Sequence, residues 1–577
     1  MKTPCIGNIM KNSFTLCVAV ACMVIASATY GQHPVESPEA AGLTPLHGTI
    51  YVNDDTNSLN NGGVQVDNIW GADITGDHKV VICLTDFLAA TDFVGMGNAW
   101  TLYDTNGNRL IPPTVITNVT GAAGNATLTN TWRSFYRTNG VPMPCNNSRS
   151  PKARANRFGS GFVVGGRGDR IGLEIATLFA INEDDSGALD VSSAASGFPI
   201  AQLMNNSGTA VSPVVAMGTD ADYQPVGNVF CHGAEILANG NIVLVGECRQ
   251  NADLIDRWGG SIAKSHAVYA VVKPNGDIVK PYSLSSEQAV EATQFNAGVG
   301  VTSNGFAIRF DKGGPTFRLF DNDGNPTSGD INMAAQVGTF LGGGPEPTAG
   351  AGGRGDGVGW HGNYKDAYVN VCAASGGVYV TVYNADGSVR YHRQTFDVGF
   401  ANNGDRVDGA IAPDGRVVIA IDDNQWDTNS VPALNRLVFG RILDAAGNPM
   451  GPHFAVSELA TPYGTGSDID SRAPRVSWRD NLIAFTWRIA TGPVSSLPVV
   501  GYRLFKETPP VALSLTRSAG NLVLSWPTNA PGYTLRSTGN LASGTWQTNS
   551  PAPVTSGSVF TVTEPVGPAN KFYQLIK

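Results

Sequence analysis

The residues best suited to chemistry in this sequence are tryptophans that lie among acidic and basic residues. An indole ring stacks on the apolar face of a sugar ring, and a carboxylate accepts hydrogen bonds from sugar hydroxyl groups. Each position also has a simpler interpretation, in which the charge is solvated in a loop and the tryptophan packs beneath it. The candidate binding residues are Trp258, Trp426, Asp422, Asp423, Asp86, Arg488, Arg249 and Asp253.

Motifs that would identify an enzyme are missing. The eight histidines have none of the spacings that bind a metal ion, and nucleophile elbows, P-loops and dinucleotide-binding glycine motifs are absent. The turn Asp321-Asn-Asp323-Gly324 offers calcium ligands, but tight turns also require Asp and Asn, and we favour the turn. We therefore expect no metal site, no cofactor and no catalysis. Carboxylates from distant segments could still converge, which leaves one alternative open.

The composition excludes several classes of protein. The 577 residues include 69 Gly and 34 Pro, 42% are hydrophobic and 15% are charged. A disordered chain needs fewer apolar and more charged residues, and coiled coils or helical repeats contain far less Gly. The net charge of −9, without basic runs, argues against nucleic acids and anionic membranes as partners.

The first 28 residues have the features of an export signal. Lys2 and Lys11 precede an apolar run from Phe14 to Ala26, and Ala26-Ser-Ala28 forms a cleavage site. The run is shorter than the ~20 residues that cross a bilayer, and no later run approaches that length. Cleavage removes two Lys and no acid, so the charge of −9 becomes −11. We expect a secreted or cell-surface protein whose mature chain has no transmembrane segment.

Short β segments separated by glycine turns fill residues 48–505. Six of them consist of an apolar strand, a turn with Gly and a second strand, and Asn-Gly or Asp-Gly favours a type I′ hairpin. The turn glycines are 80, 89, 48, 63 and 60 residues apart, as expected for β-propeller blades of ~40–50 residues with insertions. One stretch, Ser286 to Phe295, is a candidate helix. The turns lie at Asn106-Gly107, Gly187, Asn275-Gly276, Asp323-Gly324, Asp386-Gly387 and Ala446-Gly447.

One end of this region lacks a strand and the other end has a spare one. Residues 499–505 form a strand that no partner follows, whereas residues 48–52 are an isolated β segment. Pairing of the two would close a ring of about seven blades, a pattern that separate sandwiches do not predict. We therefore assign residues 29–508 to a β-propeller whose N-terminal strand, near 48–52, completes the last blade.

The two ends of the blades differ in their connections. With the strands of a blade named A to D in chain order, the A–B and C–D turns are tight, whereas four B–C connections are long: 86–98, 249–265, 422–435 and 488–497. Binding groups usually lie on long loops of a rigid scaffold. We expect Trp258 and Trp426 on the same face of the ring, opposite the tight turns.

The blades resemble those of bacterial secreted β-propeller repeat proteins. The shared motif is R-Φ-Φ-D-x-x-G-x-P-x-G, where Φ is apolar. It runs from Arg441 to Gly451 and, more loosely, from Arg318 to Pro326. The resemblance covers about 450 residues of repeat and implies the fold rather than an activity.

After Pro509-Pro510 the pattern changes to five or six short strands in residues 511–577. The alternation of Leu522, Leu524 and Trp526 with polar residues predicts a small β-sandwich. The string LSWP…YTLRSTGNLASGTWQ…KFYQLIK resembles a fibronectin-III-like C-terminal module of large secreted bacterial proteins, which implies an accessory or attachment role. The predicted fold is all-β, with about seven propeller blades followed by this sandwich.

Two cysteines flank the Asn239-Gly240 turn. A two-residue loop would place Cys231 and Cys248 directly opposite each other as a non-hydrogen-bonded pair, whose Cα atoms lie ~4.5 Å apart. That distance suits a disulfide, and we predict one here. Buried thiols are the simplest state for Cys83, Cys145 and Cys372.

Together these observations predict an exported, non-catalytic binding or scaffolding protein. It would recognise a polysaccharide or an extracellular or cell-surface protein through one face of the propeller. The alternative is a carbohydrate-active hydrolase or lyase on the same scaffold. Two carboxylates within ~10 Å of each other in an open cleft would favour the alternative.

Overall fold

A computed structural model describes most of the chain in two compact units, Met1–Glu507 and Thr508–Lys577. The expected export signal and the segments that contain Gly187, Trp258 and Trp426 lie outside the described residues. The described residues are 36–52, 71–87, 96–115, 152–168, 198–213, 215–216, 229–248, 266–287, 294–312, 314–341, 358–374, 377–396, 407–423, 437–458, 460–461, 464–465, 469–491, 499–507, 513–528, 532–540, 545–548 and 552–576.

Six antiparallel sheets of four strands follow one another along the first unit, each with its strands in chain order. Blade 1 is β3 (Gly71–Ile74), β4 (Val80–Phe87), β5 (Met96–Tyr103) and β6 (Arg109–Val115). Blade 2 is β7 (Lys152–Ala155), β8 (Phe162–Gly168), β9 (Phe198–Met204) and β10 (Val215–Ala216). Blade 3 is β11 (Val229–Ile236), β12 (Ile242–Cys248), β13 (His266–Val272) and β14 (Ile278–Leu284). Blade 4 is β15 (Gln294–Thr302), β16 (Gly305–Lys312), β17 (Pro315–Phe320) and β18 (Ile331–Asn332). Blade 5 is β19 (Val358–Gly362), β20 (Ala367–Ala374), β21 (Gly377–Asn384) and β22 (Val389–Phe396). Blade 6 is β23 (Val407–Ile411), β24 (Val417–Asp423), β25 (Leu437–Leu443) and β26 (Phe454–Ala455).

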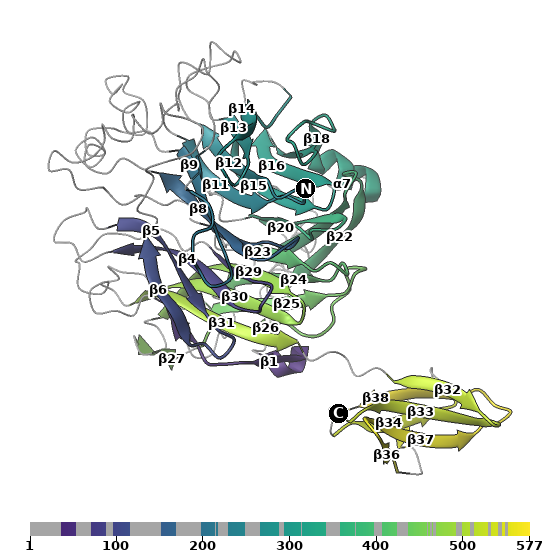
Figure 1. Cartoon of the computed structure of the whole chain (residues 1–577). Helices are drawn as coiled ribbons and strands as arrows, with labels where there is room; N and C mark the ends of the chain where they lie inside the picture. The colour runs from purple at the N-terminus through teal and green to yellow at the C-terminus, as the bar shows by residue number, and fades with distance from the viewer. Residues whose placement is uncertain are drawn as a thin grey trace, which may run out of the picture. The chain divides into compact units, whose positions relative to one another are not determined.

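Blade 7 is built from both ends of the unit. It consists of β29 (Ile469–Arg479), β30 (Leu482–Thr491) and β31 (Val499–Glu507). Two N-terminal strands, β1 (Leu43–Pro45) and β2 (Ile50–Tyr51), pair antiparallel with β31, and Ile50 lies opposite Tyr502. In Figure 1 the purple strands of blade 1 lie beside the green strands of blade 7.

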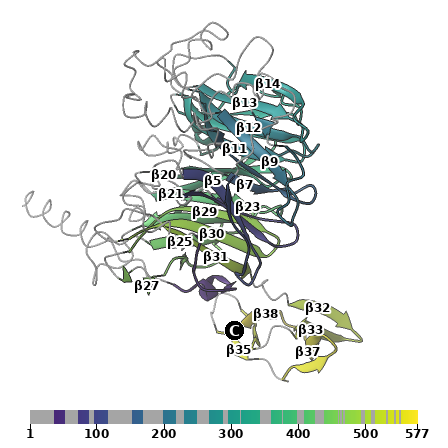
Figure 2. The ribbon, with the colours of Figure 1, turned by 60° about the vertical axis from the view of Figure 1, so that its left-hand side comes forward.

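The first strands of the seven blades form a ring. Each A strand contacts the next one along the chain, and β29 of blade 7 contacts β3 of blade 1. This arrangement is a seven-bladed β-propeller, which confirms the predicted fold class (Figures 1 and 2). Because each sheet packs on both faces, its central strands are mostly apolar, and every residue of β13 is buried.

The tight turns differ from the predicted type I′ geometry. Between β11 and β12, Gly240 has φ of 84°, whereas Asn239 keeps a negative φ. Leu237 N–H donates to the Asn241 carbonyl at 2.8 Å, so the loop holds three residues, of which one is left-handed. In blade 2 the C–D turn lies at Gly208, after β9, and the predicted turn at Gly187 lies outside the described residues.

The register of blade 3 overturns the predicted disulfide. The three-residue loop moves the pairing by one residue, so that Ile236 lies opposite Ile242. A bulge between Cys231 and Gly233 moves it again, and Cys231 lies opposite Gly246 while Cys248 lies opposite Val229. The two cysteines are therefore not directly opposed, which removes the geometry on which the predicted disulfide depends. Cys83 and Cys372 are buried.

The C–D turns of blades 1, 4 and 6 share one hydrogen-bonding pattern. In blade 6 the Oδ1 atom of Asp444 accepts from the N–H groups of Ala446 (2.9 Å) and Asn448 (2.7 Å), and Oδ2 accepts from Asn448 Nδ2 (3.0 Å). These bonds lower the pKa of Asp444. Asp104 in blade 1 and Asp321 in blade 4 make the same three bonds.

The same turns fasten each blade to the blade before it. Gly208 of blade 2 has φ of 79°, and a Cβ atom there would lie 2.1 Å from Ile111 Cδ1 of blade 1. A Cβ atom at Gly447 of blade 6 would lie 2.7 Å from the ring of Tyr391 in blade 5. Glycine therefore serves both the left-handed turn and the close approach of two blades.

The described ends of the candidate helix at 286–295 are not helical, and residues 288–293 lie outside the described residues. Residues 285–287 are bends and β15 begins at Gln294. A helix that the sequence reading missed, α7 (Met333–Leu341), follows β18 and buries Met333 and Val337. None of the helices within the described ranges is long and apolar enough to cross a bilayer.

The C-terminal unit is a small two-sheet β structure. One sheet has the order β32 (Ser514–Ser518), β33 (Asn521–Pro527), β37 (Val559–Pro565) and β36 (Val554–Ser556). The other has the order β35 (Gln547–Thr548), β34 (Thr534–Thr538) and β38 (Phe572–Ile576). Leu524, Trp526, Leu535 and Val562 form its buried core.

Candidate functional site

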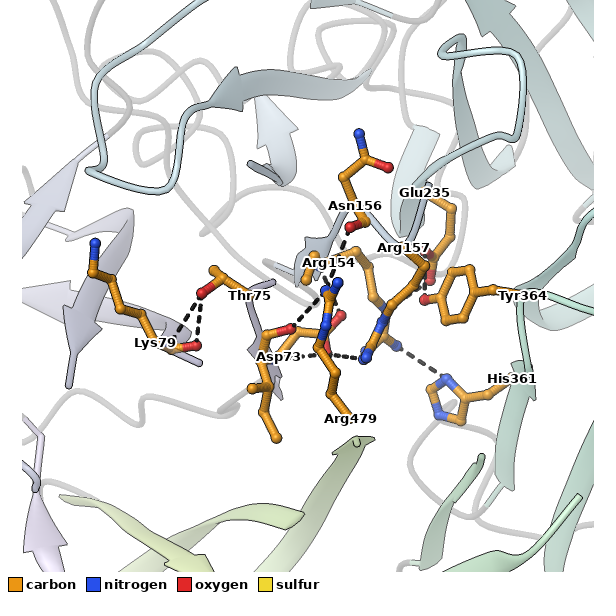
Figure 3. Close-up of polar contacts among 12 residues, drawn as sticks. Asp73, Thr75, Lys79, Arg154, Asn156, Arg157, Glu235, His361, Tyr364 and Arg479 are labelled. Atoms are coloured by element: carbon orange, nitrogen blue, oxygen red, sulfur yellow. Dashed lines mark hydrogen bonds and ion pairs between the residues drawn. The ribbon is translucent and has the colours of Figure 1, made fainter. Parts of the chain in front are cut away.

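Charged side chains meet where the A strands surround the axis of the ring (Figure 3). In four blades the penultimate residue of the A strand is ionisable: Asp73, Arg154, Glu235 and His361. Because successive A strands are neighbours, these residues meet at one level of the axis. Residues of blades 6 and 7 and of two nearby turns join them. We call the whole set the axial cluster: Asp73, Arg154, Arg157, Glu235, His361, Tyr364, Asp408, Arg475 and Arg479.

Asp73 joins blade 1 to blade 2. Its side chain is buried, and its Oδ2 atom accepts from the N–H of Ala155 at 2.7 Å. Its Oδ1 atom accepts from Arg157 Nη2 at 2.7 Å and from the N–H of Ile74 at 2.8 Å. Three donors therefore satisfy a carboxylate that burial would otherwise penalise.

Arg154 and Glu235 form a buried ion pair between blades 2 and 3. Arg154 Nε lies 2.7 Å from Glu235 Oε1, and the Tyr364 hydroxyl of blade 5 donates to Glu235 Oε2 at 3.1 Å. Burial raises the pKa of Tyr364, and the charge of Glu235 raises it further, so the phenol stays protonated and donates the hydrogen bond. Contacts between blades 2, 3 and 5 cross the axis, because blades 2 and 5 are not neighbours in the ring.

The turn between β7 and β8 lies against this network. The guanidinium of Arg157 stacks 5.2 Å from the centre of the Tyr364 ring, and the Phe158 ring meets Tyr364 edge-on at 6.1 Å. Phe158 remains 38% exposed. The turn of blade 2 thus reaches blade 5 at the end of the axis where the A–B turns lie.

His361 connects the cluster to blade 6. Arg154 Nη2 lies 3.2 Å from His361 Nδ1, and His361 Nε2 lies 2.8 Å from Asp408 Oδ1. Because arginine only donates, Nδ1 accepts and Nε2 carries the proton toward Asp408. Burial opposes the ionisation of Asp408, but His361, Arg475 and the N–H of Val476 outweigh it and hold the pKa of Asp408 well below its usual range.

The cluster is chemically quiet as it stands. Each of its three carboxylates accepts from a cation, a histidine or backbone N–H groups, and the pKa of Asp408 is lowered, whereas a general acid needs a raised pKa. Within the described ranges no group of three His, Cys, Asp or Glu residues is arranged to hold a metal ion. These contacts hold the blades together across the axis.

The predicted binding residues fall into two groups. Trp258, Trp426, Arg249 and Asp253 lie outside the described residues. Asp86, Asp422, Asp423 and Arg488 lie within strands β4, β24 and β30 rather than in loops. Asp422 is fully buried opposite Val438, and Arg488 is half-buried. The described part of the chain therefore does not bring the eight residues together, and their joint role stays a prediction.

Sequence reasoning missed the axial cluster, although a signal for it exists. A three-residue pattern recurs at the end of the A strand, just before the first turn of a blade. It consists of a small residue, an ionisable residue and the last residue of the strand. Examples are Ala72-Asp73-Ile74, Ala153-Arg154-Ala155 and Ala234-Glu235-Ile236. An ionisable residue inside an otherwise apolar strand needs partners, which only the ring supplies.

Comparisons with known proteins support no family assignment. No model of a known protein family matches the sequence, and the search of curated proteins finds no match. An α-L-arabinanase from Penicillium chrysogenum has 9% identity and a TM-score of 0.37, with 80% of this chain and 98% of that chain covered. An α-L-arabinofuranosidase from Fusarium graminearum has 10% identity and a TM-score of 0.36, with 80% and 98% covered. The Dos1 propeller has 8% identity and a TM-score of 0.34, with 84% and 93% covered. The fold assignment rests on the strands themselves.

Proposed function

We propose that this protein is an exported, non-catalytic binding protein built on a propeller scaffold. Its ligand is a polysaccharide or an extracellular protein, and the binding face is the one formed by the B–C connections. The observation that carries the proposal is the compensation of the axial carboxylates. A carboxylate held by arginine or by backbone N–H groups stabilises the ring, but it is a poor proton donor.

The topology supports the choice of face. β12 ends at Cys248 and β24 ends at Asp423, both at the ends of the blades away from the A–B and C–D turns. The connections that follow these strands carry Trp258 and Trp426. A rigid ring that presents long connections at one end is a suitable scaffold for recognition.

The C-terminal unit fits an accessory role within this proposal. The sequence suggests a fibronectin-III-like module here, and two small sheets around a buried core of four side chains support a small β-sandwich. We propose that it attaches or spaces the propeller rather than acting on a ligand. Export follows from residues 1–28 and is part of the same proposal.

A second candidate function, glycoside cleavage on the propeller, is favoured by one observation. Asp73, Glu235 and Asp408 come from three different blades and belong to one network around the axis. Glycosidases use a pair of carboxylates ~5–10 Å apart. For that role at least one of the three would have to lose its cation when substrate binds.

The experiment that tests the binding proposal is a glycan array with the full chain and two variants. Trp426→Ala should weaken binding at least tenfold, because it removes the stacking surface. His78→Ala should leave binding unchanged, because His78 lies in an A–B turn at the other end of blade 1. No binding by the wild-type chain to any glycan or extracellular protein tested, or equal binding by both variants, would contradict the proposal.

The same array distinguishes the second candidate. Release of reducing ends from any bound glycan, abolished by Glu235→Gln, would establish catalysis and replace the proposal of a non-catalytic protein. Glu235→Gln keeps the shape of the side chain and an acceptor for Tyr364, so folding can be checked in parallel by its melting temperature.

A further inference from the structure

The positive groups at the turn end of the axis outnumber the carboxylates that could pair with them. Arg154 pairs with Glu235 and Arg157 pairs with Asp73. Arg479 of β29 has no carboxylate within ion-pair distance among the described residues. Its Nη1 atom donates to the backbone carbonyls of Ile74 (3.3 Å) and Asn156 (3.4 Å), which are long hydrogen bonds.

The exposed acidic residues of the neighbouring turns contact other side chains. Asp480 Oδ2 lies 3.0 Å from His78 Nε2, and Asp77 Oδ2 lies 2.9 Å from Lys79 Nζ. Among the described residues Arg479 therefore has no carboxylate at ion-pair distance, and the charges of Asp73 and Asp480 reach it only from further away. Figure 3 shows Arg479 pointing toward Asp73 and Arg157, inside the axial cluster.

The surroundings of Arg479 disfavour its charge. Burial lowers the pKa of Arg479 and the neighbouring charge of Arg157 lowers it further, and the charges of Asp73 and Asp480 offset this lowering only in part. Half-buried cations normally have an anionic partner, because neither water nor backbone carbonyls fully replace the lost hydration. A bound anion would supply the missing partner.

The Nη2 atom of Arg479 faces Gly76, a position without a side chain. A Cβ atom at Gly76 would lie 3.1 Å from Arg479 Nη2 and 4.0 Å from the carbonyl of Gly159. Any side chain at position 76 would thus occupy the space beside Nη2. Two turns, 75–79 of blade 1 and 156–161 of blade 2, border this edge with glycine.

We propose that Arg479 binds an oxyanion group, with Arg157 behind it, at the end of the axis where the A–B turns lie. The planar edge of a guanidinium donates two parallel hydrogen bonds, which match a carboxylate or a phosphate. The exposed ring of Phe158, in the turn that also supplies the Asn156 carbonyl, offers an apolar contact beside it. A uronic acid, which carries a carboxylate on an apolar-faced ring, satisfies both features. This site lies at the opposite end of the ring from the face proposed above.

The test is the melting temperature of the full chain at constant ionic strength with D-galacturonate, inorganic phosphate or neutral D-galactose. We expect galacturonate at saturation to raise the melting temperature by about 2–4 °C and galactose to leave it unchanged. A shift with phosphate of equal size would identify a free inorganic anion as the ligand. A shift with galacturonate alone identifies the saccharide carboxylate.

Arg479→Gln should abolish the shift, whereas Arg390→Gln, which alters a half-buried arginine of blade 5 beside Asp366, should retain it. If Arg479→Gln fails to fold, Gly76→Val serves instead, because it keeps the arginine and blocks its edge, and it should weaken binding at least tenfold in calorimetry. No shift in the wild-type chain with any anion, or the same shift in Arg479→Gln, overturns the proposal. Trp426→Ala should leave the shift intact, so failure of the B–C face and failure of this site can be told apart.

Discussion

The C–D turns at the rim of the propeller and the axial cluster at its centre both stabilise charged side chains with hydrogen bonds, but they use different residues. At the rim, Asp104, Asp321 and Asp444 repeat one turn with the same three hydrogen bonds. At the axis, equivalent positions hold Asp73, Arg154, Glu235 and His361, and no two blades carry the same residue there. The same turn can recur in several blades, because its hydrogen bonds form between neighbouring residues of that turn. The axis cannot repeat, since seven identical charges facing one line would repel one another.

The axis should be the more sensitive of the two regions. Asp73→Ala removes the acceptor of Ala155 N–H and leaves the charge of Arg157 buried without its partner. We expect a loss of about 3–5 kcal/mol in the free energy of unfolding, measured with denaturant. Asp480→Ala, which removes an exposed partner of His78, is the control and should cost below about 1 kcal/mol. Similar losses in both variants would refute the special role of the axis.

Substitutions at two turn glycines can separate the energetic cost of contact between blades from the cost of the turn geometry. Gly208 and Gly240 both have left-handed φ angles, but a Cβ atom at Gly240 meets no atom within 4 Å, whereas at Gly208 it meets Ile111 and Trp100. Gly240→Ala should cost about 1–2 kcal/mol for the backbone alone. Gly208→Ala should cost a further 1–3 kcal/mol or so for overpacking. Equal thermal shifts in the two variants would show that the blades do not need this close approach.

The axis should also carry a dependence on pH. The folded-state pKa of Asp408 lies below the unfolded value of about 3.9, so its charge stabilises the fold above that value. This contribution is complete above about pH 5 and is lost as the pH falls toward the folded-state pKa. Asp408→Asn should therefore cost about 1.5–3 kcal/mol at pH 7 and progressively less in acid. Melting curves of both proteins between pH 3 and 7 check this, and a constant difference between them would contradict it.

The rim turn should give the smallest effect. Asp444→Ala removes three hydrogen bonds of an exposed turn, and water replaces them, so we expect a loss of about 0.5–1.5 kcal/mol. Asp321→Ala should behave in the same way, and the double variant should show the sum, because the two turns are in different blades. A deviation from additivity above about 0.5 kcal/mol would show that the rim turns act together.

Part of the candidate site was open to prediction and part was not. The glycine turns and apolar strands in the sequence predicted the blades. The isolated segment at 48–52 was predicted to complete the last blade, and it pairs with β31. The disulfide failed on two local details, a three-residue turn and a bulge after Cys231, each of which moves the register by one residue. The axial cluster stayed hidden because Glu235 pairs with Arg154 of blade 2 and His361 contacts Asp408 of blade 6, contacts that only closure of the ring creates.

The sequence by itself determined the blade architecture of this protein, because strands, turns and hairpins arise from neighbouring residues. Alternation and glycine placement fix which segments pair, and these signals act within about 50 residues in a blade. The tertiary structure alone decided what lies at the axis. Closing the ring brings Asp73 to Arg157, Glu235 to Tyr364 and His361 to Asp408, across separations of 84, 129 and 47 residues. The physical reason is that a buried charge is stable only beside its partner, and no local pattern in the chain specifies which partner that will be.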